Sequence, residues 1–196
     1  MTDTSAACDA SDPRIVRSRA AVLEATVELL GEVGHSGTTI EAIAERSGVA
    51  KTTIYRHWPR RAPLLVDALY SRVEHAAFEP TGDLRADLLA LVGGLARKLR
   101  DPNWSRMVAT LLDAAESDPE IAELSAAFTQ QRRELCRSVL DRGVQAGELR
   151  ADADTDTAAQ LLGGAVFYKR LILRRPATDA DLEVVVDLIL DGLRTR

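Results

Sequence analysis

The sequence predicts an all-α protein, and three observations predict it. Apolar residues recur at helical intervals of three and four along most of the chain. Clusters of Pro, Gly, Asp and Ser separate these periodic segments, and strand patterns are scarce. The 196 residues, 46% hydrophobic and 28% charged, are typical of a globular chain long enough for one large domain or two small ones.

The first helix is expected to begin at Pro13, capped by Ser11 or Asp12, after an acidic tail (residues 1–10) that we expect to be disordered. Its apolar residues fall on one helical face: Val16, Ala20, Leu23, Val27 and Leu30. Three glycines then break the pattern: Gly31, Gly34 and Gly37.

Two short helices and a tight turn are predicted next. Thr38-Thr39-Ile40-Glu41 has the pattern of a capping box, and a helix from about Thr39 to Arg46 follows it. Ser47-Gly48-Val49 forms the turn, and a second short helix runs to Trp58. Another helix is expected over about 60–77.

The best domain boundary is the run of turn formers from Glu79 to Asp83. Beyond it the periodicity predicts five helices, at about 84–100, 103–116, 119–146, 155–173 and 179–194. The uncharged stretch from Thr157 to Tyr168 is apolar nearly all round, so its helix is expected to be buried on more than one side. Gly163 and Gly164 in that stretch suggest close approach by a neighbouring helix.

Several classes of protein and site are excluded. The two cysteines, Cys8 and Cys136, are too few and too far apart for a disulfide framework or a CxxC metal site. The N-terminus lacks the apolar run of a signal peptide, and no stretch is long enough to span a membrane. Nucleotide-binding and hydrolase motifs are absent. We therefore expect a cytoplasmic protein that is not an enzyme and holds neither metal nor cofactor.

Charge is distributed unevenly along the chain. The net charge is −5, yet residues 14–61 carry eight cations and five acids, a local +3. Between Arg46 and Arg61 there are five cations and no acid. A basic segment built as short helix, turn and short helix is the arrangement of a helix-turn-helix, whose second helix enters the major groove of DNA.

A helical wheel of the second short helix separates two faces. Ile54 and Trp58 share one face and are expected to pack inward. Thr52 and Arg56 point the opposite way, with Thr53 and Tyr55 on the flanks, and this surface suits base edges. Lys51, Arg60 and Arg61 stand at helix starts and suit phosphates, as does the helix N-terminus at Thr39.

The motifs in this segment resemble those of the TetR (tetracycline repressor) family over about 14–75. The matching residues occur in the family's order: Thr39-Ile40, Ile43-Ala44, Gly48-Val49, Thr53-Ile54-Tyr55, Trp58-Pro59, and Arg61 followed by Leu64. The departures are Ser47 for Ala, Ala50 for the Ser that caps the recognition helix, Trp58 for Phe, Arg61 for Lys and Ala62 for Glu. Ala50 matters most, because Ala is a poor cap and costs about 1 kcal/mol.

The resemblance implies an all-α homodimer, with a helix-turn-helix DNA-binding domain at 11–77 and a larger effector-binding and dimerisation domain at 84–196. It implies a ligand-responsive regulator, expected to be a repressor that leaves its double-stranded DNA operator when a small molecule binds. It further places Thr39, Tyr55 and Arg61 against phosphates. The remaining residues on or beside the recognition surface are Lys51, Thr52, Thr53, Arg56 and His57. The alternative is a helical interaction module whose basic patch binds an acidic protein.

The C-terminal part offers weaker signals. Candidate ligand-binding residues are Trp104, Met107, Phe128, Gln131, Phe167 and Tyr168. The scarcity of clustered charge favours an apolar or neutral effector. Candidate dimer-interface residues on the last two helices are Leu161, Gly164, Phe167, Val185 and Ile189.

Overall fold

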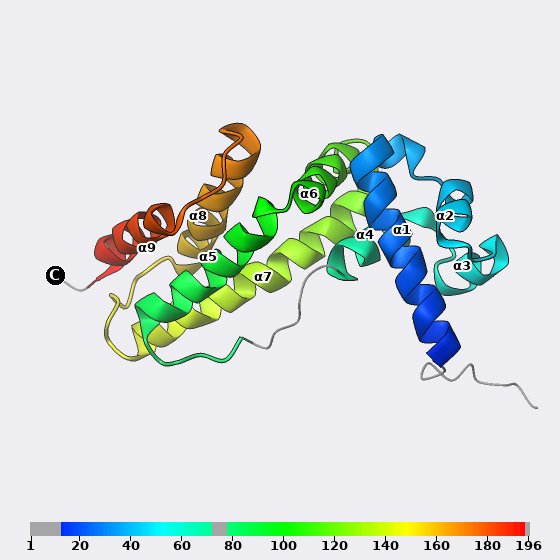
Figure 1. Cartoon of the computed structure of the whole chain (residues 1–196). Helices are drawn as coiled ribbons and strands as arrows, with labels where there is room; N and C mark the ends of the chain where they lie inside the picture. The colour runs from blue at the N-terminus through cyan, green and yellow to red at the C-terminus, as the bar shows by residue number, and fades with distance from the viewer. Residues whose placement is uncertain (1–12, 72–77, 195–196) are drawn as a thin grey trace, which may run out of the picture. The chain divides into compact units, whose positions relative to one another are not determined.

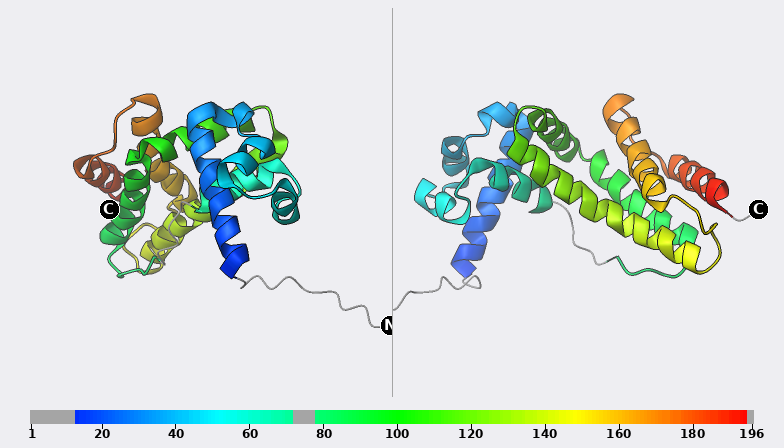
Figure 2. Two further views of the ribbon diagram at one scale, coloured as in Figure 1. Left: turned by 45° about the vertical axis from the view of Figure 1, so that its right-hand side comes forward. Right: turned by 180° about the vertical axis from the view of Figure 1, so that it is seen from behind.

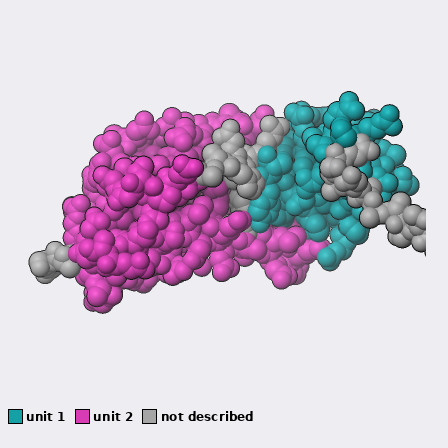
Figure 3. Space-filling view, turned by 90° about the horizontal axis from the view of Figure 1, so that it is seen from below, with its two compact units in different colours: residues 1–73 teal, residues 74–196 magenta. Residues whose placement is uncertain are grey.

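A computed structural model describes residues 13–71 and 78–194, apart from the side chain of Phe128. The chain divides into two compact units, Met1–Val73 and Glu74–Arg196 (Figure 3). Every regular element in the described ranges is helical (Figures 1 and 2). The predicted all-α class is therefore confirmed. The expected tail and the Ser11 or Asp12 cap lie outside the described residues.

The N-terminal unit is built from four helices: α1 (Pro13–Gly37), α2 (Ile40–Ser47), α3 (Lys51–His57) and α4 (Arg61–Ser71). Helix α1 packs against α2 and α4, and α2 packs against α3. Apolar side chains from all four helices form the core, with Leu30, Ile43, Ile54, Leu64 and Leu65 nearly or wholly inaccessible to solvent. This core fixes α3, the shortest of the four helices, on the surface of the unit.

Helix α1 differs from its prediction at both ends. Val16 is 53% exposed, and Ala20 is also exposed. The expected apolar face is therefore wrong for the first two turns, since packing against α2 and α4 begins further along, where Val22 and Leu23 are buried. The helix also continues through Gly31 and kinks at Gly34, whose φ of 71° is left-handed.

The predicted capping box is wrong as well. Thr39, not Thr38, caps α2, and its Oγ1 accepts a hydrogen bond from the Ala42 amide at 3.1 Å. Thr38 is buried, and its hydroxyl donates to the Gly34 carbonyl oxygen at 2.7 Å instead. The helix therefore starts one residue later than the box required, and its third residue is Ala42 instead of Glu41.

The C-terminal unit has five α-helices and one π-helical turn. Their bounds are α5 (Leu84–Arg100), α6 (Pro102–Ala115), α7 (Pro119–Gln145), α8 (Thr155–Phe167), η1 (Tyr168–Ile172) and α9 (Asp179–Leu193). Helix α7 packs against α5, α6 and α8, and α9 packs against α5 and α8. Leu88, Met107, Ile121, Leu140 and Leu162 are fully buried in this core.

Polar side chains fix the start of α5 and the boundary segment before it. Asp83 caps α5 by accepting from the Ala86 amide at 2.8 Å. The buried Asp87 accepts from the Thr81 amide and hydroxyl at 2.8 and 2.7 Å, and from Arg142 of α7 at 3.1 Å. Burial opposes ionisation of Asp87, but these bonds to Thr81, Gly82 and Arg142 hold the pKa of its carboxyl below the usual value.

The predicted helix over 155–173 is corrected in its last turn. Helix α8 ends at Phe167 and continues as the π-helical turn η1. Arg170 of η1 donates to the Leu99 carbonyl oxygen at 2.9 Å and also bonds the Ser105 hydroxyl, so it ties the turn to α5 and α6. At its start, Asp154 caps α8 by accepting from the Thr157 amide at 3.0 Å.

Among the described residues, no helix is long and apolar enough to cross a membrane.

Candidate nucleic-acid interface

The turn between α2 and α3 is set by one glycine and two buried side chains. Gly48 adopts a left-handed φ of 68° and ends α2, a conformation that costs a residue with a side chain about 1–2 kcal/mol. Ile54 and Trp58 are 0% and 3% exposed and anchor α3 to the core. The predicted inward face is therefore confirmed, and the opposite side of α3 must face solvent.

The outer face of α3 carries donors of several kinds. Lys51, Thr52, Tyr55 and Arg56 are exposed, with Tyr55 48% accessible. Thr53 and His57 are half-buried on the flanks. A cation, a hydroxyl, a phenol and a guanidinium on one short helix can donate to base edges and phosphate oxygens.

Ala50 precedes α3 without making a side-chain capping bond. The Thr53 and Ile54 amides instead donate to the Ala50 carbonyl oxygen at 2.9 and 3.1 Å. The weak cap that the sequence predicted is thus present, and it leaves N–H groups at the start of α3 without a capping side-chain acceptor.

Two cations of the acid-free window are already paired with acids from outside it. Arg46 bonds Glu28 at 3.2 Å and Glu32 at 2.8 Å, both on α1. Lys51 bonds Glu41 of α2 at 3.1 Å. The pKa of Glu32 is lowered by its hydrogen bond to Arg46, and that of Glu41 by its bond to Lys51. The positive charge of this surface is therefore smaller than the sequence window suggests.

Arg61 is directed toward the backbone of its own unit. Its guanidinium donates to the carbonyl oxygens of His35 and Thr38 at 3.3 and 3.4 Å and lies 2.8 Å from the His35 ring nitrogen Nε2. Arg56, by contrast, has no bonded partner among the described residues. Arg60 is exposed at the start of α4.

Asp67 of α4 was not anticipated from the sequence, and it orients the end of α3. One carboxylate oxygen, Oδ2, accepts from the Trp58 indole nitrogen at 2.9 Å and from Arg19 of α1 at 3.0 Å. The Arg19 guanidinium also lies over the Trp58 ring, 5.4 Å from its centroid. Three helices therefore converge on the residue that anchors α3. The signal in the sequence was Trp in place of Phe, since an inward indole requires a nearby acceptor.

Family comparisons agree with this geometry. The family described as "Bacterial regulatory proteins, tetR family" matches residues 22–68, which contain the anchored α3 and the turn before it. The family described as "Tetracyclin repressor-like, C-terminal domain" matches residues 78–189. The chain belongs to the TetR family of transcriptional regulators.

Individual TetR-family proteins are similar over nearly the whole chain. The HTH-type transcriptional regulator YdeS of Bacillus subtilis is 32% identical over 184 residues, covering 93% of this chain and 91% of that protein. The DNA-binding transcriptional repressor TetR of Mycobacteroides abscessus is 30% identical, covering 87% and 90%. The crystal structure of the TetR family transcription regulator SCO0332 is 35% identical, covers 91% of this chain and 100% of that one, and has a TM-score of 0.71.

The candidate ligand residues of this TetR-family chain lie in different environments. Trp104 and Met107 of α6 are buried in the C-terminal unit, at 6% and 0% exposure. Phe167 is half-buried, whereas Gln131 and the 54%-exposed Tyr168 face solvent. The side chain of Phe128 lies outside the described residues. The structure thus brings Trp104 and Met107 into the interior and leaves Gln131 and Tyr168 out of it.

Proposed function

We propose that this TetR-family chain is a homodimeric repressor that binds an operator through its 11–77 domain and releases it when a small molecule binds the 84–196 domain. The observation that carries the proposal is the outer face of α3. Lys51, Thr52, Tyr55 and Arg56 are exposed there, while Ile54 and Trp58 anchor the helix to the core from the other side. Such a face fits the major groove of double-stranded DNA.

The predicted contacts sort by position on this surface. Arg56 and Thr52 stand opposite the anchors and suit base edges, with Thr53 and His57 beside them. Tyr55 and Lys51 suit flanking phosphates, and Lys51 exchanges Glu41 for a phosphate when DNA arrives. Thr39 and Arg61 support the interface from the N-terminus of α2 and the start of α4. Bacterial DNA lies in the cytoplasm, so the DNA-binding role of the bacterial relatives also supports a cytoplasmic location for this chain.

A dimer is supported by apolar side chains left exposed on the last helices. Leu161, Tyr168 and Ile172 lie along α8 and η1, and Val184 and Leu188 lie one turn apart on α9, each more than half exposed. Of the predicted interface residues, Leu161 and Gly164 are exposed, while Phe167, Val185 and Ile189 are half-buried at the edge of this surface. A symmetric dimer would cover these residues and present two α3 helices to a palindromic site.

The test is a gel shift of the purified protein with DNA that flanks its own gene. We expect a sequence-preferring complex whose logarithmic affinity falls linearly with the logarithm of salt concentration. A shift that random DNA competes away equally well, or no shift at all, contradicts the proposal. In that case the alternative function, binding of an acidic protein by the basic surface, would be favoured.

A further inference from the structure

Arg132 of α7 differs from the other half-buried arginines of the described residues because it has no bonded partner. Six other arginines in the described ranges are half-buried, and each forms a hydrogen bond or an ion pair with an oxygen of the protein. They are Arg61, Arg85, Arg133, Arg137, Arg142 and Arg170. Arg132 is equally buried but has neither a hydrogen bond nor an ion pair within the described part of the chain. Its five donors therefore find no acceptor among the described residues.

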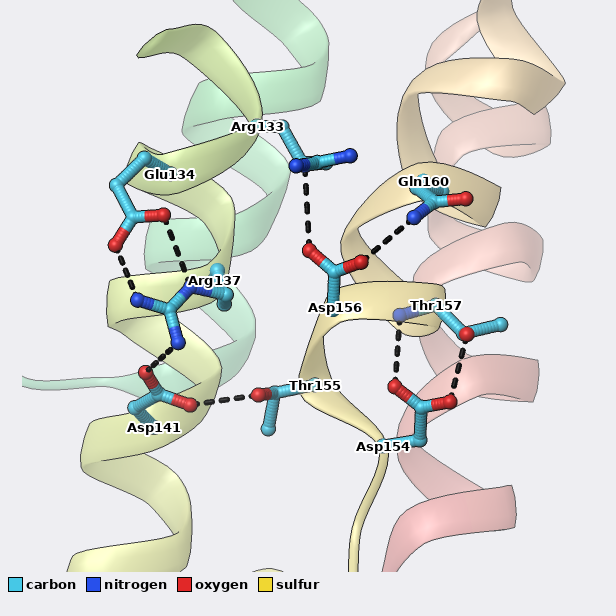
Figure 4. A network of polar contacts seen from close by, with 9 residues as sticks. All are labelled: Arg133, Glu134, Arg137, Asp141, Asp154, Thr155, Asp156, Thr157 and Gln160. Carbon is cyan, nitrogen blue, oxygen red and sulfur yellow. Dashed lines mark hydrogen bonds and ion pairs between the residues drawn. The ribbon is translucent and has the colours of Figure 1, made fainter. Parts of the chain in front are cut away.

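The position of Arg132 on α7 shows which way it faces. Ile121 and Val139, at 0% and 1% exposure, define the core side of the helix. At 100° per residue Arg132 falls within about 20° of both, whereas Arg133 and Arg137 turn away toward acids. Figure 4 shows these two arginines bonded to Asp156, Glu134 and Asp141. Burial lowers the pKa of the Arg132 guanidinium, as expected for a cation removed from water without a counter-ion.

Two polar atoms on α6 and α7 are buried without a hydrogen-bond partner. The hydroxyl of Ser125 lies two helical turns before Arg132 on α7, and its Oγ is inaccessible to solvent and unbonded. The indole nitrogen of Trp104 is buried and unbonded as well, and this side chain is only 6% exposed. An unsatisfied buried polar group costs about 1–3 kcal/mol, so these two, in addition to the unbonded guanidinium of the half-buried Arg132, require a physical reason.

Trp104 and Arg132 lie at the same level of the unit. Helices α6 and α7 pack against each other as an antiparallel pair joined by the short turn 116–118 (Figures 1 and 2). Trp104 is thirteen residues before Ser117, and Gln130 is thirteen residues after it. Counting from the turn therefore places Trp104 at the level of the part of α7 that carries Arg132, and Met107 and Leu111 on the same helix are buried apolar residues.

We propose that the effector is an organic carboxylate with an apolar body, held by Arg132 with help from Trp104 and Ser125. This inference rests on the proposed function and departs from the neutral effector that composition favoured. A guanidinium offers two parallel N–H donors that match one carboxylate. Arg142 is already paired with the buried Asp87, and Arg170 already donates to the Leu99 carbonyl oxygen and the Ser105 hydroxyl. Among the described residues Arg132 is therefore the half-buried arginine left with unbonded donors, and a single carboxylate fits it. Met107, Leu111 and Val139 would contact the apolar body.

The experiment compares carboxylates with primary amides of the same shape on the purified full-length protein. The probe pairs are decanoate with decanamide, indole-3-acetate with indole-3-acetamide, and 1-naphthoate with 1-naphthamide, titrated by calorimetry near neutral pH. We expect at least one acid to bind about 10- to 100-fold more tightly than its amide, the effect of a charge-assisted hydrogen-bonded pair. Equal or tighter binding of every amide, or no binding by any acid, overturns the proposal.

Variants of α7 locate the charge that causes the preference. Arg132→Met should remove the preference for the acid, because it keeps the length of the side chain and deletes its donors. Arg137→Met removes the same charge from the outer side of the same helix and should keep the preference. If Arg132→Met retains the preference, or Arg137→Met loses it, the assignment to Arg132 is wrong.

The stability of Arg132→Met gives an independent readout. Arg132 has no bonded partner among the described residues. The Arg132→Met variant without ligand should therefore melt at the same temperature as the parent protein or at a higher one. A clear decrease in the melting temperature would show that Arg132 has a structural role instead. Trp104→Phe serves as a second binding variant, and it should weaken the acid about 3- to 10-fold by deleting one donor. Failure of the gel shift counts against the proposed function alone, because acid binding is measured without DNA.

Discussion

Arg56 and Arg46 carry the same charge in one short basic segment, but only Arg56 is available to DNA. Arg46 is bonded to Glu28 and Glu32 at 3.2 and 2.8 Å, whereas Arg56 has no partner in the described ranges. Arg56→Ala should weaken operator binding by about 1–3 kcal/mol if the side chain reads a base, or lower the salt slope by about one if it binds a phosphate.

The matched control for this prediction is Arg46→Ala, which removes an equal charge from the same segment. It should change operator affinity much less, because its charge is balanced by α1, and an exposed pair of this kind contributes about 0–1 kcal/mol to stability. Fluorescence anisotropy across a salt series measures both variants. Equal losses would show that net charge, not the face of α3, controls binding.

Asp67 is the second residue whose role can be isolated. Its Oδ2 accepts from the buried indole of Trp58 at 2.9 Å and from Arg19 at 3.0 Å. Asp67→Ala leaves the indole N–H without an acceptor and should lower the free energy of unfolding by about 1–3 kcal/mol. Asp67→Asn keeps an acceptor oxygen and loses only the exposed charge pair, so it should cost less than Asp67→Ala in urea unfolding. The opposite order would refute the role given to the indole bond.

Sequence reasoning predicted the anchors of this interface and missed what surrounds them. Ile54 and Trp58 follow from helical spacing, which is a local property and can be read from consecutive residues. The pairing of Arg46 with α1, and of Asp67 with Trp58, joins residues that only tertiary packing brings together. The same holds for Arg132: its position on the core face of α7 is predictable from Ile121 and Val139, but its lack of a partner is visible only after folding.

At the scale of elements, helix α3 lacks a side-chain N-cap. Seven residues are too few for a helix that is stable alone, so its order comes from the core under Ile54 and Trp58. Ala50 makes no side-chain capping bond, and its backbone at φ −58° and ψ 138° suits an N-cap residue. Substituting Ala50→Ser should supply the missing acceptor and raise the free energy of unfolding by about 0.5–2 kcal/mol.

Ala50→Val is the control, because valine adds volume at the cap without an oxygen. Chemical denaturation of the three proteins decides the point, and no gain for Ala50→Ser over Ala50→Val would refute it. The same comparison bears on DNA affinity. A firmer start of α3 reduces the ordering that binding must complete, so operator affinity should rise with stability if the weak cap loosens the recognition helix.

The two glycines of α8 concern a prediction that a single chain does not fulfil. Gly163 and Gly164 suggested close approach by a neighbouring helix. A Cβ built on either residue meets no atom within 4 Å in this chain. The close neighbour must therefore come from another copy of the chain if the expectation is to hold, and Gly164 lies among the exposed residues of the proposed dimer surface.

For the whole molecule, the net charge of −5 divides into +3 over residues 14–61 and −8 over the rest. The structure sharpens this division, since Asp67, an acid outside 14–61, pairs with Arg19 at 3.0 Å and so offsets part of the +3 within the N-terminal unit. Weak residual charge limits non-specific attraction to DNA, which is largely electrostatic. Selective binding then depends on two recognition helices acting together, and hence on the proposed dimer.

Leu188 offers the most direct test of that dependence. It is 69% exposed on α9, so a glutamate there costs the monomer little but would place a charge inside an apolar seam. Leu188→Glu should convert the dimer to a monomer in sedimentation equilibrium at micromolar concentration. It should also weaken binding to an operator with two half-sites far more than binding to a single half-site. Two half-sites about 34 Å apart increase affinity only when two recognition helices are linked in one dimer. Leu112→Glu, at a 51%-exposed position on α6, is the matched control and should remain dimeric. A Leu188→Glu protein that stays dimeric with full operator affinity would move the interface away from α9.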